Sequence, residues 1–274
     1  MNKMKIVILA AALLSIIVAV RPASAGSGSI TIKGSTTVLP IAQRTAEEFM
    51  DKNSAINISV QGGGSSVGIA SIIDETTDIG DASRPIKDKE LARAVSNGAS
   101  PKANVVAMDG IAVIVNPSNN ITAMTKQQIK DIYTGNMSSW ADVGSNSGKI
   151  VIVGRDSASG TFEAFTEKAL NKQKTRPDAL LQASNQAVAQ VVGSAPGAIG
   201  YIGLGYITNK VKPVTVNGIE CTKVNVLSGK YPLARPLFMY TNGAPSGAVK
   251  EYLDFILSAE GQKLVEEEGF VGLK

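Results

Sequence analysis

The chain has 274 residues, of which 44% are hydrophobic and 18% charged, so it has the composition of a globular protein with one large domain or two lobes. It contains no histidine and a single cysteine, Cys221, which excludes a Ser-His-Asp or Cys-His nucleophile, a histidine-ligated metal site and an intrachain disulfide. The net charge of +4 gives no support to nucleic-acid binding, which requires a clustered basic face.

The first 25 residues have the pattern of a secretory signal peptide. Lys3 and Lys5 precede an apolar run over residues 6–20, and Ala23-Ser24-Ala25 supplies the small residues of a cleavage site. A membrane anchor is the alternative, but a spanning helix needs about 20 apolar residues. We expect cleavage after Ala25 and a periplasmic location. Cleavage removes basic residues and no acidic ones, so the mature chain is close to neutral.

Short strands alternate with helices along the mature chain. The periodicity of apolar residues in the first half predicts strands at residues 29–33, 56–60, 77–80 and 104–115, and helices at residues 39–52, 66–75 and 87–95. In the second half it predicts helices at residues 125–134, 159–171, 185–192, 246–257 and 259–268, and strands at residues 150–153 and 233–240. Residues 198–201 follow the third of these helices. Such alternation is typical of an α/β fold with mostly parallel sheets.

The order of these elements predicts two lobes. The second lobe is expected to begin near residues 111–115, and the strand at residues 233–240 is expected to lead back to the first lobe. We therefore assign residues 26–111 and 238–274 to lobe 1 and residues 112–237 to lobe 2. Two crossings between the lobes would form a hinge beside a cleft.

Four turns rich in glycine, serine and threonine lie next to the predicted strands and helices: Gly34-Ser35-Thr36-Thr37, Gly62-Gly63-Gly64-Ser65-Ser66, Asp81-Ala82-Ser83-Arg84-Pro85 and Arg155-Asp156-Ser157-Ala158-Ser159-Gly160-Thr161. The first N–H groups of a helix have no partner inside it and lie at the positive end of its dipole, so such turns suit an oxyanion. Arg155 adds a guanidinium that can bind two oxygens at once. One such turn alone is usually an ordinary helix cap, and none is a Walker loop or a dinucleotide fingerprint. The set of four predicts a site for a small tetrahedral oxyanion.

These motifs resemble those of the phosphate-binding proteins that serve phosphate ABC importers. Residues 109–116 (DGIAVIVN) and 198–201 (AIGY) also match, in the same order and over nearly the whole mature chain. The resemblance implies an α/β, two-lobed type II periplasmic-binding-protein fold with a hinge of two crossing strands. It also implies capture of inorganic phosphate between the lobes and delivery to a membrane permease. The ligand residues that it implies are Thr36, Thr37, Ser65, Ser66, Ser83, Arg84, Arg155, Ser159, Gly160 and Thr161, with Thr36 and Thr37 donating from both backbone and hydroxyl.

One position departs from the family pattern. Many family members have an aspartate where this chain has Ser83, and that carboxylate accepts a hydrogen bond from protonated phosphate and so rejects sulfate. Asp81 and Asp156 are the nearby carboxyl groups that could take this role. Arg84 fits either a second anion partner or a salt bridge.

Three other functions remain open at this point. The first is a receptor for sulfate, molybdate or a phosphonate, and the second is a phosphoryl hydrolase with Ser159 or Thr161 as nucleophile. The third is a surface scaffold that exposes Tyr133, Trp140, Tyr201 and Tyr206. We expect a monomeric, non-enzymatic receptor without metal or cofactor.

Overall fold

The structure, a computed structural model, describes residues 28–145 and 148–273. The predicted signal peptide lies outside these residues. Within them, no helix combines the length and the apolar character that crossing a membrane demands.

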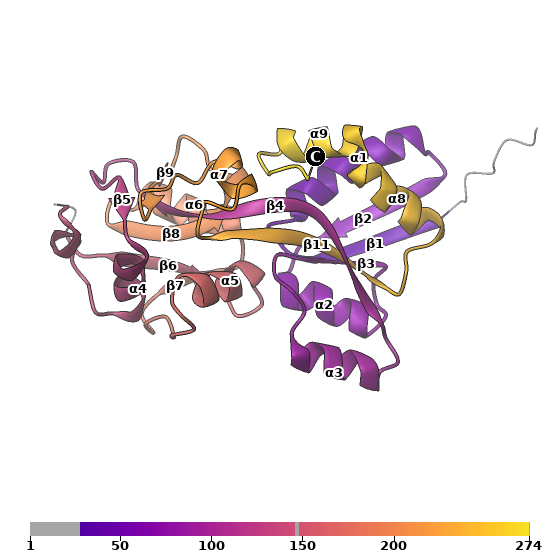
Figure 1. Cartoon of the computed structure of the whole chain (residues 1–274), viewed down its shortest axis with the longest axis horizontal. Helices are drawn as coiled ribbons and strands as arrows, with labels where there is room; N and C mark the ends of the chain where they lie inside the picture. Colours follow the sequence, from indigo (N-terminus) through magenta and orange to yellow (C-terminus); the bar gives the residue numbers. More distant parts are fainter. Residues whose placement is uncertain (1–27, 146–147, 274) are drawn as a thin grey trace, which may run out of the picture.

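A single path of hydrogen-bonded strands runs through the whole molecule in the order β2-β1-β3-β11-β4-β8-β6-β7 (Figure 1). The strands of this path are β1 (Gly28–Gly34), β2 (Ile56–Gln61), β3 (Ile79–Ala82), β4 (Pro101–Val115), β6 (Val151–Arg155), β7 (Leu180–Gln182), β8 (Ala198–Gly203) and β11 (Ala234–Asn242). Helices gather around each end of the path, which gives two lobes. Lobe 1 contains β1 to β3, and lobe 2 contains β6 to β8.

The two lobes are joined by β4 and β11. Residues 101–110 of β4 pair with β11, whereas residues 111–115 of the same strand pair with β8. The prediction of mostly parallel sheets holds within each lobe, where β1 pairs with β2 and β3, and β6 with β7 and β8, in parallel. At the crossings it is wrong. There β11 runs back to lobe 1 and lies antiparallel to β4 and β3, and β4 lies antiparallel to β8 and β9 (Lys212–Pro213).

Lobe 1 has a hydrophobic core on each face of its sheet. Ile30, Phe49 and Leu253 belong to the core beneath three helices, and Ile69 and Ile72 belong to the core on the opposite face. The three helices of the first face are α1 (Leu39–Lys52), α8 (Gly247–Leu257) and α9 (Ala259–Glu267), and the helices of the second are α2 (Ser65–Ile73) and α3 (Asp88–Ser96).

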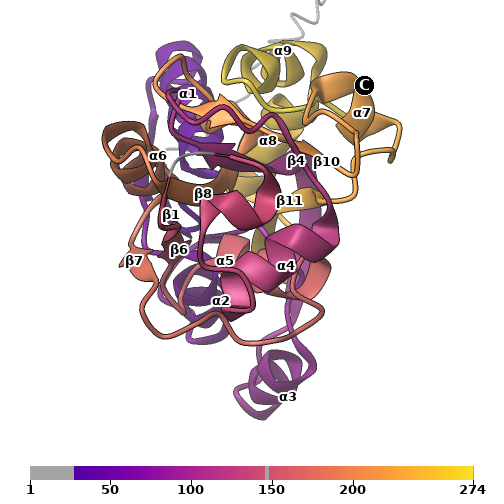
Figure 2. The ribbon, with the colours of Figure 1, turned by 90° about the vertical axis from the view of Figure 1, so that its left-hand side faces the viewer.

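Lobe 2 is packed around aromatic side chains. The rings of Phe165 and Tyr201 stack with centroids 3.9 Å apart, and Tyr133 meets Phe165 edge-on at 4.8 Å. Because Tyr133, Tyr201 and Trp140 are buried, they form no exposed patch, and the scaffold hypothesis loses its support. The helices of this lobe are α4 (Lys126–Thr134), α5 (Gly160–Lys168), α6 (Asn185–Ser194) and α7 (Lys223–Leu227), and Figure 2 shows them from the lobe 2 end.

Most predicted elements agree with the structure to within two or three residues. The prediction for α1 is confirmed at both ends, and Thr125 caps α4 as expected by accepting a hydrogen bond from the backbone of Gln128. The prediction that α5 extends to residue 171 is wrong. That helix ends at Lys168, and Asn171 and Lys172 have left-handed φ values of 51° and 64°. Several short elements had no sequence signal: β5 (Ala123–Met124), β7, β9 (Lys212–Pro213), β10 (Thr215–Val216), α7 and the 3-10 turns Trp140–Val143 and Leu204–Tyr206.

Candidate anion-binding site

The four Gly/Ser/Thr turns come together where the lobes meet. Within lobe 1 they are tied by hydrogen bonds from the backbone N–H of Gly64 to the carbonyl of Gly34 (2.8 Å) and from that of Ser83 to Ser65 Oγ (2.9 Å). The turn of lobe 2 reaches them through Thr161, whose Oγ1 lies 2.9 Å from Thr37 Oγ1. The N–H of Ser66 also donates to the carbonyl of Ala158 at 3.1 Å.

Gly160 is required by the closeness of this contact. A Cβ at this position would lie 2.2 Å from Ser65 Oγ and 2.8 Å from Ser83 Oγ, both in the opposite lobe. Ser159 precedes it as the N-cap of α5, accepting a hydrogen bond from the backbone of Phe162. The start of α5 therefore lies directly against two hydroxyls of lobe 1.

Arg155 ends β6 and is buried, with 1% of its surface exposed. Its Nε donates to the carbonyl of Gln182 at 3.0 Å, and its Nη2 donates to Thr36 Oγ1 across the lobes at 3.1 Å. Nη1 is also buried, but it has no hydrogen-bond partner among the described residues. Burial lowers the pKa of this guanidinium, and a bound anion would offset that cost. Arg155 thus presents an unpaired donor at the meeting point of the lobes.

A second buried guanidinium, Arg235, was not predicted as a site residue. It lies at the start of β11, where its Nη2 donates to Thr161 Oγ1 at 2.9 Å and to Thr37 Oγ1 at 3.4 Å. Asp109 of β4 holds it through bonds of 2.8 and 3.0 Å to Nη2 and Nε. Burial raises the pKa of Asp109, and the neighbouring Arg235 opposes that rise.

Asn185 is a further residue of the site that the sequence patterns do not predict. It is the first residue of α6, is completely buried, and its Nδ2 donates to Thr37 Oγ1 at 3.0 Å. The available signal was weak for both missed residues. Arg235 stands in the strand expected to return to lobe 1, and Asn185 stands at a predicted helix start, but neither belongs to a Gly/Ser/Thr turn.

Two residues implied by the resemblance are already occupied by other contacts. The Nη atoms of Arg84 bond to both carboxylate oxygens of Glu90 at 2.7 and 2.8 Å, and the Oγ of Ser66 accepts from Arg84 Nη2 at 3.1 Å. Thr37 also differs from expectation. Its backbone N–H donates to Ser35 Oγ at 3.1 Å, so its hydroxyl is the group that faces the other lobe.

The two candidate proton acceptors differ in their surroundings. Asp156 Oδ1 accepts the N–H of Ala158 at 2.8 Å and so shapes the turn. Asp81 is 1% exposed, and its Oδ1 has no hydrogen-bond partner among the described residues. Desolvation raises the pKa of Asp81 well above the ordinary value of 3.8.

Of the residues expected in the site, all but Ser66 are buried: Thr36, Thr37, Ser65, Ser83, Arg84, Arg155, Ser159, Gly160 and Thr161. Two guanidiniums, Arg155 and Arg235, are balanced there by one closely bonded carboxylate, Asp109. The surplus positive charge and the ring of hydroxyls suit an anion rather than a cation. The described residues contain no group of three His, Cys, Asp or Glu side chains able to hold a metal ion.

Comparison with known proteins gives one consistent answer. Residues 19–260 match the family described as a PBP superfamily domain. The chain is 33% identical over 250 residues to the phosphate-binding protein PstS of Bacillus subtilis, covering 89% of this chain and 81% of the relative.

Two solved structures are also similar to this chain. A putative phosphate ABC transporter substrate-binding protein of Clostridium perfringens, solved with bound phosphate, superposes with a TM-score of 0.85 at 34% identity, over 90% of this chain and 100% of the other. An ABC-type phosphate transport receptor of Vibrio cholerae gives a TM-score of 0.74 at 30% identity, over 88% and 99%. The chain belongs to the PBP superfamily and, within it, to the family of the phosphate-binding proteins.

Proposed function

We propose that this protein is an exported receptor that captures inorganic phosphate between its lobes and delivers it to the membrane permease of an ABC importer. The observation that carries the proposal is the pair of buried guanidiniums, Arg155 and Arg235, where hydroxyls of both lobes meet. Relatives named as phosphate-binding proteins, and a similar structure with phosphate bound, support phosphate as the ligand. The other oxyanions are not favoured.

The proposed ligand set combines expected residues with the two missed ones. Donors from lobe 1 are Thr36, Thr37, Ser65 and Ser83, and donors from lobe 2 are Arg155, Ser159, Gly160 and Thr161. Arg235 and Asn185 complete the set, because both contact Thr37 Oγ1. Ser66 and Arg84 are left out of the set, because Glu90 and Ser66 already bind the guanidinium of Arg84 within lobe 1.

The remaining parts of the proposal concern the whole chain. Lobe 1 comprises residues 26–111 and 238–274, and lobe 2 residues 112–237, with cleavage of the signal peptide after Ala25. The receptor is a monomer, is periplasmic and breaks no bond. Cleavage is checked by the N-terminal sequence and mass of the exported protein, and the monomer by its mass in solution. A catalytic role would reveal itself as turnover of a chromogenic phosphate ester, which we do not expect.

Calorimetric titration of the mature protein with phosphate tests the function. Bound ligand is first removed by partial unfolding and dialysis, and the titration is repeated with excess sulfate at about pH 5 and about pH 8. Saturable binding that survives sulfate is the expected result. Binding abolished by sulfate would leave a general oxyanion receptor, and no heat with either anion would refute the proposed site.

A further inference from the structure

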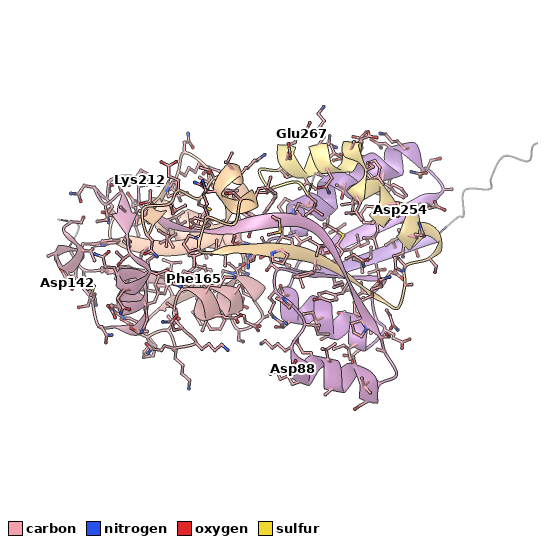
Figure 3. All side chains as sticks on the ribbon, in the orientation of Figure 1. Asp88, Asp142, Phe165, Lys212, Asp254 and Glu267 are labelled. Atoms are coloured by element: carbon pink, nitrogen blue, oxygen red, sulfur yellow. The ribbon has the colours of Figure 1, made fainter. Side chains whose placement is uncertain are left out.

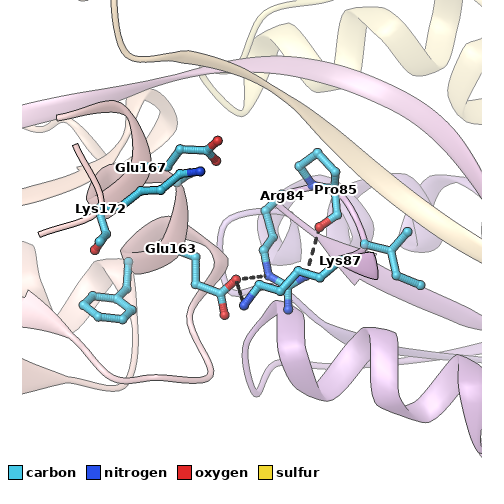
Figure 4. A pocket seen from close by; sticks show the side chains of 10 residues that line it. Arg84, Pro85, Lys87, Glu163, Glu167 and Lys172 are labelled. Atoms are coloured by element: carbon cyan, nitrogen blue, oxygen red, sulfur yellow. Dashed lines mark hydrogen bonds and ion pairs between the residues drawn. The ribbon is translucent and has the colours of Figure 1, made fainter. Parts of the chain in front are cut away.

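Beside the proposed anion site, a group of charged side chains joins the two lobes (Figure 4). Glu163 of α5 in lobe 2 reaches Arg84 and Lys87, which stand in the segment between β3 and α3 of lobe 1. The distances from Glu163 Oε2 are 2.5 Å to Arg84 Nε and 2.6 Å to Lys87 Nζ. A cavity of about 430 Å³ lies beside these residues.

The two Nη atoms of Arg84 are bound by residues of lobe 1. Glu90 accepts from both of its Nη atoms, Ser66 Oγ accepts from Nη2, and the carbonyl of Pro85 accepts from Nη1 at 2.9 Å. Among the described residues, Arg84 Nε has no hydrogen-bond partner. It forms an ion pair with the carboxylate of Glu163. Lobe 1 therefore fixes this guanidinium with one charged edge directed at lobe 2.

Among the described residues, the hydrogen bond and the ion pairs of the Glu163 side chain are all made with lobe 1. In addition to Arg84 and Lys87, the Oγ of Ser66 donates to Glu163 Oε1 at 3.4 Å. The two side chains of the central pair are largely buried, at 4% exposure for Arg84 and 16% for Glu163. Separation of the lobes would break all three contacts, so their interaction energy belongs to the closed arrangement alone.

The pair is also adjacent in sequence to the anion site on both sides. Arg84 follows Ser83 directly, and Glu163 stands two residues after Thr161 in the first turn of α5. An anion bound by both turns holds the lobes together. The carboxylate of Glu163 then lies next to the guanidinium of Arg84. The ion pair and the anion therefore stabilise the same arrangement of the lobes.

We propose that Glu163 is a positioning residue for phosphate capture, which raises the affinity by pairing with Arg84 and Lys87 only when the lobes are closed. The inference rests on the proposed function. A receptor whose binding-competent state is partly populated loses apparent affinity in proportion to that population. Glu163 has no hydrogen bond or ion pair with a member of the proposed ligand set, from which Ser66 and Arg84 are left out, so its contribution acts through closure.

Glu163→Gln is the variant that tests this role, with phosphate affinity measured by calorimetry. We expect the dissociation constant for phosphate to rise about 3- to 10-fold. This loss lies between the contribution of an exposed charge pair and that of a buried one. Faster release should account for most of the change. Glu167→Gln is the matched control, because Glu167 lies one turn further along α5 and lines the same cavity, but makes no ion pair among the described residues. Its affinity should equal that of the parent.

Two further measurements distinguish this role from a merely structural one. They are the dependence of phosphate affinity on salt and the effect of a substitution at Lys87. Affinity of the parent should fall more steeply with added salt than that of Glu163→Gln, because the ion pair is screened only where it exists. Lys87→Met should lower affinity in the parent and have a smaller effect in Glu163→Gln. Equal affinities of parent and Glu163→Gln would overturn the inference and leave the proposed function standing. Failure of the parent itself to bind phosphate would refute the proposed function instead.

Discussion

Arg155 shows how one side chain ties the second lobe to the first. Its Nε and Nη2 are held by carbonyls of lobe 2, and Nη2 also reaches Thr36 of lobe 1. The geometry depends on a planar fork, which a lysine cannot reproduce because its charge is a single point on a flexible stem.

Replacing Arg155 with lysine therefore tests the fork rather than the charge. We expect phosphate affinity to fall about 10- to 100-fold, the cost of one lost charge-assisted hydrogen bond. Calorimetry gives the affinity, and circular dichroism checks that the fold is kept. Arg93→Lys is the control, because Arg93 is an exposed arginine that pairs with Asp74 on the surface of lobe 1. Unchanged affinity in Arg155→Lys would remove this guanidinium from the site.

The buried carboxyl group of Asp81 predicts how the free energy of unfolding depends on pH. Desolvation raises its pKa in the folded protein above 3.8, so the folded state holds a proton that the unfolded state releases once the pH exceeds that value. The contribution of Asp81 to the free energy of unfolding is therefore greatest at low pH and declines as the pH rises above 3.8.

Asp81→Asn removes this proton uptake. The variant should gain stability relative to the parent between pH 4 and pH 7, as measured by urea unfolding across that range. Asp51→Asn, at an exposed carboxylate near the end of α1, is the control for the loss of one carboxylate. If the free energies of unfolding of Asp81→Asn and of the parent change with pH in parallel, Asp81 is ionised in the folded state.

At the scale of elements, the start of α5 depends on the absence of a side chain. The Cβ of an alanine at Gly160 would approach Ser65 Oγ to 2.2 Å, and this clash arises only when the lobes meet. The three atoms nearest to that Cβ all belong to lobe 1.

Gly160→Ala should consequently fold normally and lose most phosphate affinity, by at least about tenfold, because the clash opposes closure. Gly28→Ala is the matched control, since its Cβ would meet only Ala248 at the ordinary distance of 3.6 Å. Affinity is measured by calorimetry and stability by thermal unfolding without phosphate. A large loss of stability in the ligand-free variant would show instead that the contact is permanent.

For the whole molecule, two lobes connected through β4 and β11 imply a hinge. Charged side chains labelled in Figure 3, such as Asp142 of lobe 2 and Asp254 of lobe 1, lie far from the junction, whereas the junction itself is lined by hydroxyls and paired charges. The contacts that stabilise closure are thus concentrated where a ligand of both lobes would sit.

Small-angle scattering with and without phosphate measures this hinge. The ligand-free protein should have the larger radius of gyration, and saturating phosphate should reduce it and raise the melting temperature. Gly160→Ala should remain at the larger value at a phosphate concentration that saturates the parent. Identical scattering of the parent in both conditions would contradict hinge closure.

Much of this molecule could be predicted from local patterns. The apolar periodicity of α1 and the Thr125 cap of α4 are encoded within a few residues, and so are the four turns that follow the strands. Their placement together could also be expected, because the carboxyl ends of parallel strands meet at one edge of a sheet. The alternation of strands and helices likewise indicated two α/β lobes.

The tertiary structure alone decided which side chains complete the site. Arg235 and Asn185 reach Thr37 from elements far away in the sequence, and Arg84, which stands in a predicted turn, is held by Glu90 and Glu163 instead. The direction of a guanidinium depends on the carboxylates and carbonyls that surround it after folding. No local pattern records those neighbours, so sequence located the turns, and packing of the two lobes selected their partners.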